Sequence, residues 1–151
     1  MFRSFIGRGR LPEDVCSAEE ITTYVKTTRD VDKTTNRVRE AVFLPRRIRG
    51  RLETSVCRSA TLNAAAVWAV CSTHVDPRLP KPMIGRGIGP AWSIIRDTGL
   101  HMHGDGHPHP YHANILGWHD EPGKPDNEIK HNWKHVAQRI AAHFPYTARP
   151  G

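Results

Sequence analysis

Residues 52 to 58 read Leu52-Glu53-Thr54-Ser55-Val56-Cys57-Arg58. Leu52, Thr54 and Val56 alternate with Glu53, Ser55 and Cys57, which is the period-two pattern of a half-buried β-strand. Ser55 and Cys57 therefore share one face of this strand, and Arg58 lies at its end. A strand of this kind needs hydrogen-bonded neighbours, so the flanking sequence must supply the rest of a sheet.

The flanking sequence predicts three more strands and four helices, in the order helix, two strands, two helices, two strands, helix. A Ser17-x-x-Glu20 capping box followed by apolar residues at helical spacing predicts the first helix over 18–28. Residues 85–90 are rich in glycine and are interpreted as a flexible turn. The other expected strands are 41–44, 100–103 and 112–118, and the other expected helices are 64–73, 90–99 and 127–144. Together they predict an α+β fold, with a small mostly antiparallel sheet of about four strands and three to four helices packed on it.

Length and composition indicate one domain. The chain has 151 residues, of which 38% are hydrophobic, enough for one modest core. We expect a basic N-terminal arm over 1–16, a single domain over 17–146 and a short tail over 147–151. No apolar run approaches the roughly 20 residues that span a bilayer, so no membrane partner is expected. Three cysteines without CxxC spacing favour reduced thiols and a cytoplasmic location.

Positive charge is concentrated on arginines around one predicted hairpin. The formal net charge of the chain is +7. Seven arginines against two glutamates give residues 36–58 a local net charge of 7 − 2 = +5. Guanidinium groups bind phosphate oxygens through two parallel hydrogen bonds. We therefore expect nucleic acid, RNA more than DNA, to bind this segment, with an acidic protein partner as the alternative. The expected contacts are Arg37, Arg39, Arg46, Arg47, Arg49 and Arg51.

Histidines are the second compositional excess, with six of the ten lying within residues 101–119. His101 and His103 share a strand face, and Asp105 could join them in a site for zinc or another divalent metal. A second arrangement resembles the HNH nuclease pattern, with His103, Asn114 and either His131 or His135. A third resembles the His-x-His-x-Asp-x-His motif of metallo-β-lactamase-type hydrolases, but one inserted residue and the short chain argue against it. Surface decoration is the favoured interpretation of most of these histidines, so no cofactor is expected.

Residues 110–118 form the most distinctive string, Pro110-Tyr111-His112-Ala113-Asn114-Ile115-Leu116-Gly117-Trp118. Together with Phe43-x-Pro45 and Ser55-Val56-x-Arg58, it resembles a family of small uncharacterised bacterial proteins. The resemblance covers roughly residues 35–143 and matches at Ser55, Arg58, His112 and Asn114. It implies a bacterial, cytosolic protein but no particular activity.

The same four residues suggest a chemistry. His112 and Asn114 share a strand face, and neighbouring strands would bring Ser55 and Arg58 near them. An imidazole as general acid or base, a guanidinium stabilising a phosphorane and an orienting amide suit phosphodiester cleavage without a metal. We therefore expect a nucleic-acid-binding protein that acts as a small ribonuclease of toxin or defence type. The alternatives are a Cys57–His112–Asn114 nucleophile, a non-catalytic accessory subunit that docks through its arginines, and a histidine-cluster metal domain.

Overall fold

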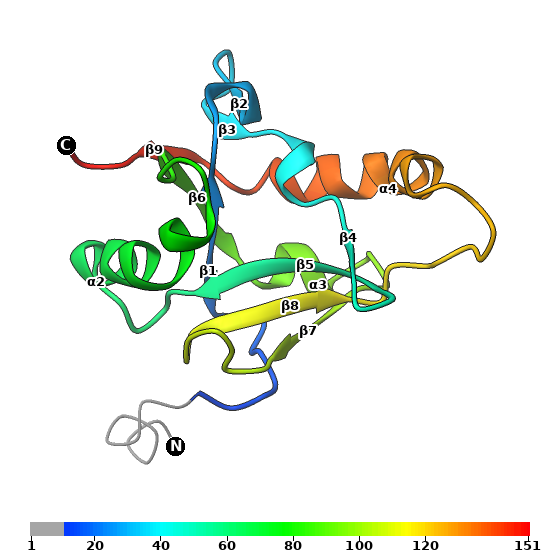
Figure 1. Cartoon of the computed structure of the whole chain (residues 1–151), viewed down its shortest axis with the longest axis horizontal. Coiled ribbons are helices and arrows are strands. Elements are labelled where there is room, and N and C mark those ends of the chain that lie inside the picture. The colour runs from blue at the N-terminus through cyan, green and yellow to red at the C-terminus, as the bar shows by residue number, and fades with distance from the viewer. Residues whose placement is uncertain (1–10) are drawn as a thin grey trace.

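The computed structural model describes residues 11–151 and shows a sheet-rich fold with three helices (Figure 1). The strands are β1 (Glu20–Val25), β2 (Val31–Asp32), β3 (Arg37–Val38), β4 (Arg46–Ile48), β5 (Arg51–Arg58), β6 (Gly85–Pro90), β7 (His101–Gly104), β8 (His112–Leu116) and β9 (Tyr146–Ala148). The helices are α2 (Ala64–Val70), α3 (Trp92–Ile95) and α4 (Asp126–Ala141). A π-helical turn over Cys71–Val75 extends α2, and 3-10 turns cover Thr28–Asp30, Glu40–Val42 and Asp76–Arg78.

The strands form one curled antiparallel sheet in the order β7-β8-β5-β1-β6-β9, with β4 added beside β5 as the seventh strand. β2 and β3 make a separate small hairpin. The predicted sheet of about four strands is therefore wrong. The prediction omitted β1, β4, β6 and β9, because their sequences either follow helical spacing, carry glycine, or are only three residues long.

Strand β5 has two different neighbours along one of its edges. β4 lies opposite Arg51–Glu53, whereas β1 lies opposite Cys57 and Arg58. β8 covers the other edge over residues 54–57. β1 and β4 therefore diverge around the middle of β5, and the sheet is forked at that point.

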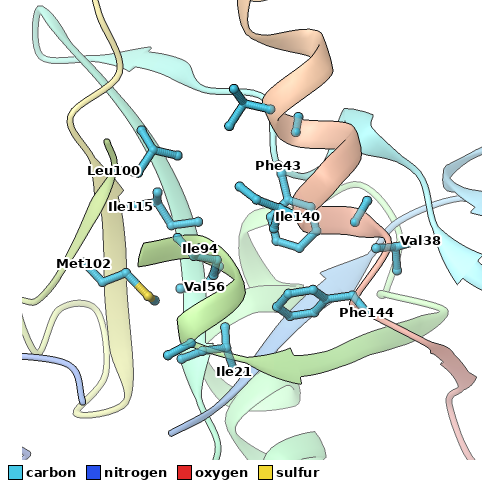
Figure 2. Packing of buried hydrophobic residues seen from close by; sticks show 14 of the residues in the cluster. Ile21, Val38, Phe43, Val56, Ile94, Leu100, Met102, Ile115, Ile140 and Phe144 are labelled. Atoms are coloured by element: carbon cyan, nitrogen blue, oxygen red, sulfur yellow. The ribbon is translucent and has the colours of Figure 1, made fainter. Parts of the chain in front are cut away.

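One face of the sheet carries the main hydrophobic core, under α3 and α4. Figure 2 shows Ile21, Val56 and Ile115 pointing from the strands toward Ile94, Ile140 and Phe144. The rings of Phe43 and Phe144 lie 4.8 Å apart at the centre of this layer. A smaller cluster of Trp68, Cys71 and Met83 packs α2 onto the opposite face, near β1. Over β5 and β8, that opposite face is covered in part by the loop between β7 and β8.

The predicted first helix is wrong, because residues 20–25 form β1 in the middle of the sheet. Its β-branched residues Ile21, Thr22, Thr23 and Val25 are all buried, which suits a strand covered on both faces. The Glu19 carboxylate accepts the Cys16 amide hydrogen in a turn rather than capping a helix. The predicted strand at 41–44 is also wrong, since a 3-10 turn occupies Glu40–Val42.

The glycine-rich segment over 85–90 is a strand, β6, and not the expected turn. Gly85, Gly87 and Gly89 lie opposite Val25, Thr23 and Ile21, so all three face the core. A β-carbon at Gly87 would stand 2.7 Å from Val38 Cγ1. The glycines therefore allow the chain around Phe144 to pack directly against the backbone of β6.

Several predicted elements are confirmed. The strand at 52–58 is β5, the strands at 100–103 and 112–118 are β7 and β8, and the helices near 64–73 and 127–144 are α2 and α4. The sheet also uses residues outside the expected domain limits of 17–146, through an Asp14–His103 bridge and through β9. Most of the expected basic arm, residues 1–10, lies outside the described residues. In the described part of the chain, no helix is long and apolar enough to cross a membrane.

Candidate functional site

The face of β5 and β8 opposite the main core holds a histidine paired with a carboxylate. His112 Nδ1 lies 2.7 Å from Asp105 Oδ1. The Asn114 side-chain amide donates to the other carboxylate oxygen, Asp105 Oδ2, at 3.0 Å. His112 and Asn114 are two residues apart on β8, so their side chains share the face that Asp105 covers.

Asp105 reaches this position because it begins the loop between β7 and β8. The loop folds back over the hairpin, and the His107 backbone N–H donates to Asp105 Oδ1 at 3.1 Å, closing an Asx turn. Gly106, at φ +70°, provides the left-handed backbone that the turn requires. The carboxylate is thus held by three donors from a span of ten residues.

Electrostatics favour an ionised Asp105. Partial burial acts to raise the pKa of this carboxyl, but the hydrogen bonds from His112, the His107 amide and Asn114 outweigh it and lower the pKa. An ionised acceptor at Nδ1 fixes the neutral imidazole as the Nδ1–H tautomer, which leaves Nε2 with its lone pair free. His112 is therefore oriented to accept a proton at Nε2.

His112 lies where two hollows meet. A wide groove of about 970 Å³ runs over Asp105, Asn114, Ser55 and His107, with Arg49, Arg51 and Arg78 among its walls. A second cavity of about 390 Å³ enters the fork between β1 and β4. His112, Ser55, Glu53 and Ile48 line both. A bound molecule could therefore contact the imidazole from a cationic side and from a more apolar side.

The structure brings together three of the four predicted catalytic residues. Ser55 lies directly opposite Asn114 in the β5–β8 register, and it is exposed. Cys57 lies opposite His112 on the same face. Burial raises the pKa of the Cys57 thiol to about 11, so this side chain is a neutral thiol rather than a ready nucleophile.

Arg58 is the fourth predicted catalytic residue, and the structure places it away from His112. Its side chain points to the core face of β5, where it is 2% exposed. The guanidinium donates to both carboxylate oxygens of Glu19, at 2.9 and 2.8 Å, and also contacts the carbonyl of Pro12. These contacts tie the segment before β1 to the sheet, so Arg58 has a structural role here.

The predicted arginine surface divides into separate places. Arg37 and Arg39 lie on and beside the β2–β3 hairpin, which stands apart from β4 and β5 (Figure 1). Arg47 faces α4, where it contacts Asp120 at 2.8 Å and Asp126 at 3.0 Å. Arg46 lines the fork cavity, while Arg49 and Arg51 line the groove. Three of the six predicted arginines thus lie beside the candidate site.

His109 is a buried neighbour of His112. Its Nδ1 accepts the Tyr111 backbone N–H at 3.2 Å, and its ring centroid lies 5.8 Å from that of His112. Burial, assisted by the charges of His112 and His74, lowers the pKa of His109 to about 4. His109 is therefore a neutral imidazole at neutral pH, and it adds no charge beside His112.

The predicted metal ligands His101, His103 and Asp105 do not converge on one point. His103 lies opposite Asn114 in register and His101 opposite Leu116, while the Asp105 carboxylate contacts His112 and Asn114 instead. His131 and His135 are exposed on α4. Within residues 11–151, no three His, Cys, Asp or Glu side chains form a group that could hold a metal ion.

Sequence reasoning missed the role of Asp105 as the partner of His112, and it missed Glu53, Arg78 and His109 altogether. One signal was available for Asp105. Two predicted strands, 100–103 and 112–118, joined by a short loop form a hairpin, and a carboxylate at the start of that loop can fold back onto the second strand. Arg78 comes from the turn after α2, and no local pattern places that turn beside β5.

Comparison with known proteins adds no relative: no family model, no curated protein and no solved structure matches this chain.

Proposed function

We propose that this protein binds RNA in the groove beside β5 and cleaves it with His112 as the general base. The observation that carries the proposal is the Asp105–His112 pair in a groove walled by Arg49, Arg51 and Arg78. Guanidinium groups suit a phosphodiester, and an oriented neutral imidazole suits removal of a proton from a hydroxyl.

The chemistry needs no reagent beyond RNA and water. His112 Nε2 takes the proton of a ribose 2′-hydroxyl, and the 2′-oxygen forms a bond to the adjacent phosphorus. The bond from phosphorus to the 5′-oxygen breaks, and that oxygen takes a proton from water in the open groove. A 2′,3′-cyclic phosphate and a 5′-hydroxyl result. Asp105 stabilises the imidazolium, and arginines of the groove stabilise the charge on the phosphorane.

RNA is favoured over DNA because the nucleophile in this reaction is the 2′-hydroxyl, which DNA lacks. The proposal keeps the bacterial, cytoplasmic setting and the toxin or defence role suggested by the sequence. The alternative hypothesis is that the arginines bind an acidic protein partner. Retention of the protein on immobilised RNA distinguishes the two hypotheses. Electrostatic binding to RNA weakens steeply as salt rises, whereas no retention at about 50 mM salt would favour the protein partner.

The decisive test compares His112→Asn with His131→Asn, an exposed histidine on α4, on a fluorescent single-stranded RNA. We expect His112→Asn to lose at least about 100-fold in rate while still binding RNA, because general-base catalysis contributes that much. His131→Asn should match the wild type. A matched RNA with 2′-deoxy residues should bind without being cut. An unchanged cleavage rate in His112→Asn would overturn the assignment.

A further inference from the structure

The fork cavity differs in chemistry from the groove that it joins at His112. Its walls include the apolar residues Val42, Leu44, Val75 and Met83. It lies where β1 and β4 separate along β5, so the gap in the sheet gives it depth. The groove therefore presents arginines to one side of His112, whereas the fork cavity presents apolar side chains together with polar ones to the other side.

Glu53 stands at the junction of the two hollows. Its side chain lines both, and the residue is only 8% exposed. Arg51 donates to a single carboxylate oxygen, Glu53 Oε2, through Nε at 3.1 Å and Nη2 at 2.8 Å. Among the described residues, Glu53 Oε1 accepts no hydrogen bond. This oxygen remains accessible from the two hollows, so it can accept a hydrogen bond from a molecule bound there.

We propose that the fork cavity binds the nucleobase next to the cleaved phosphate, and that Glu53 Oε1 accepts a hydrogen bond from its amino group. This inference rests on the proposed function, and it names the part of the RNA that would bind in the fork cavity. A nucleotide has the required two-part chemistry, since a flat, weakly polar base adjoins an anionic phosphate. In the same way, the arginine-lined groove and the fork cavity, which has both apolar and polar walls, meet at His112.

The amino group makes the proposal specific. Cytosine presents an amino group at the position where uracil presents a carbonyl oxygen, and the two bases are otherwise nearly the same in shape. A carboxylate accepts from the cytosine amino group but repels the uracil oxygen. Glu53 should therefore favour bases that carry an amino group over uracil.

The experiment measures cleavage of the dinucleotide pairs CpA against UpA and ApC against ApU, so that either side of the phosphate is tested. We expect the cytosine member of one pair to react at least about 10-fold faster, since a well-formed base contact discriminates by about 1–3 kcal/mol. Glu53→Gln should bring that ratio near one, because a glutamine amide can donate to uracil. Glu128→Gln, on the exposed surface of α4, is the matched control and should keep the ratio.

A second variant tests the cavity rather than the carboxylate. Ala41 lines the fork cavity and is exposed, so Ala41→Trp should fill the entrance without removing a core side chain. It should raise KM for the preferred dinucleotide, whereas Ala60→Trp, on an exposed turn beyond β5, should not. Circular dichroism confirms that both variants fold.

Failure of this inference can be separated from failure of the proposed function. If RNA cleavage depends on His112 but the rates for cytosine and uracil are equal in both pairs, the proposed nucleobase site is wrong. The ribonuclease assignment would still hold in that case. If no RNA is cut, NMR titration with cytidine and uridine monophosphates still tests the cavity. Shifts of the Tyr24 and His109 signals with cytidine but not uridine support it, and shifts with neither overturn it.

Discussion

Asp105 Oδ1 lies 2.7 Å from His112 Nδ1, and both residues belong to the β7–β8 hairpin and its loop. The pair therefore forms within one short stretch of sequence, and Asn114 of the same hairpin donates a further hydrogen bond to the carboxylate. Strand β5 contributes the other half of the site by placing Ser55 opposite Asn114. The proposed reaction centre therefore depends on one hairpin and one strand pairing.

Replacing the Asp105 carboxylate should leave the His112 imidazole without the acceptor that fixes its tautomer. In Asp105→Asn the amide can donate to Nδ1, which would put the imidazole proton on Nε2 and block its role as base. We expect RNA cleavage to fall by about 10²- to 10⁴-fold with RNA affinity retained. Single-turnover cleavage and filter binding on the same RNA measure the two quantities. Cleavage at the wild-type rate would mean that Asp105 does not orient the base.

The arginines should differ in how they contribute to RNA affinity. Arg78 lines the groove, whereas Arg47 is engaged by Asp120 and Asp126 on the far side of β4. Arg78→Ala should reduce the slope of log affinity against log salt by about 1, and Arg47→Ala should leave it nearly unchanged. Fluorescence anisotropy across a salt series gives the slopes. Equal effects of the two substitutions would place the RNA elsewhere on the molecule.

Arg58 should be required for folding rather than chemistry. Removing it leaves Glu19 largely buried without its partner, at a cost of about 3–5 kcal/mol in the free energy of unfolding. Arg58→Met should therefore unfold at much lower urea, and adding Glu19→Gln should recover part of the loss. Urea denaturation measures both. If the Arg58→Met protein is fully stable but does not cleave RNA, then Arg58 has a role in the reaction and not in folding.

His109 should make the fold sensitive to acid. Its pKa is about 4 in the folded protein against an ordinary value of 6.5, so the unfolded chain binds the proton first as pH falls. Its stabilising effect is complete above pH 6.5 and is lost as pH falls from 6.5 toward 4. The loss is on the order of 3 kcal/mol. His109→Asn keeps an acceptor for the Tyr111 amide but cannot titrate, so urea denaturation should show a flatter dependence on pH. An equally steep dependence would place the acid-sensitive group elsewhere.

Local sequence patterns were sufficient for part of the fold and part of the site. The alternation over residues 52–58 predicted β5, and the apolar spacing along residues 129–144 predicted α4. The same period of two predicted that His112 and Asn114 share a face. These features depend only on backbone geometry within one element, so neighbours distant in the sequence do not change them.

Contacts between distant segments decided the rest. Glycines that look like a turn become the strand β6, because Phe144 and Val38 pack onto them. Arg58 meets Glu19 across 39 residues, and Arg47 meets Asp120 across 73, so charges that look free in the sequence are already paired. The cavity beside Glu53 exists only because β1 and β4 separate along β5. The sequence alone therefore determined which residues face together within an element, whereas the tertiary structure decided which charges remain available, because burial and ion pairing depend on what packs opposite.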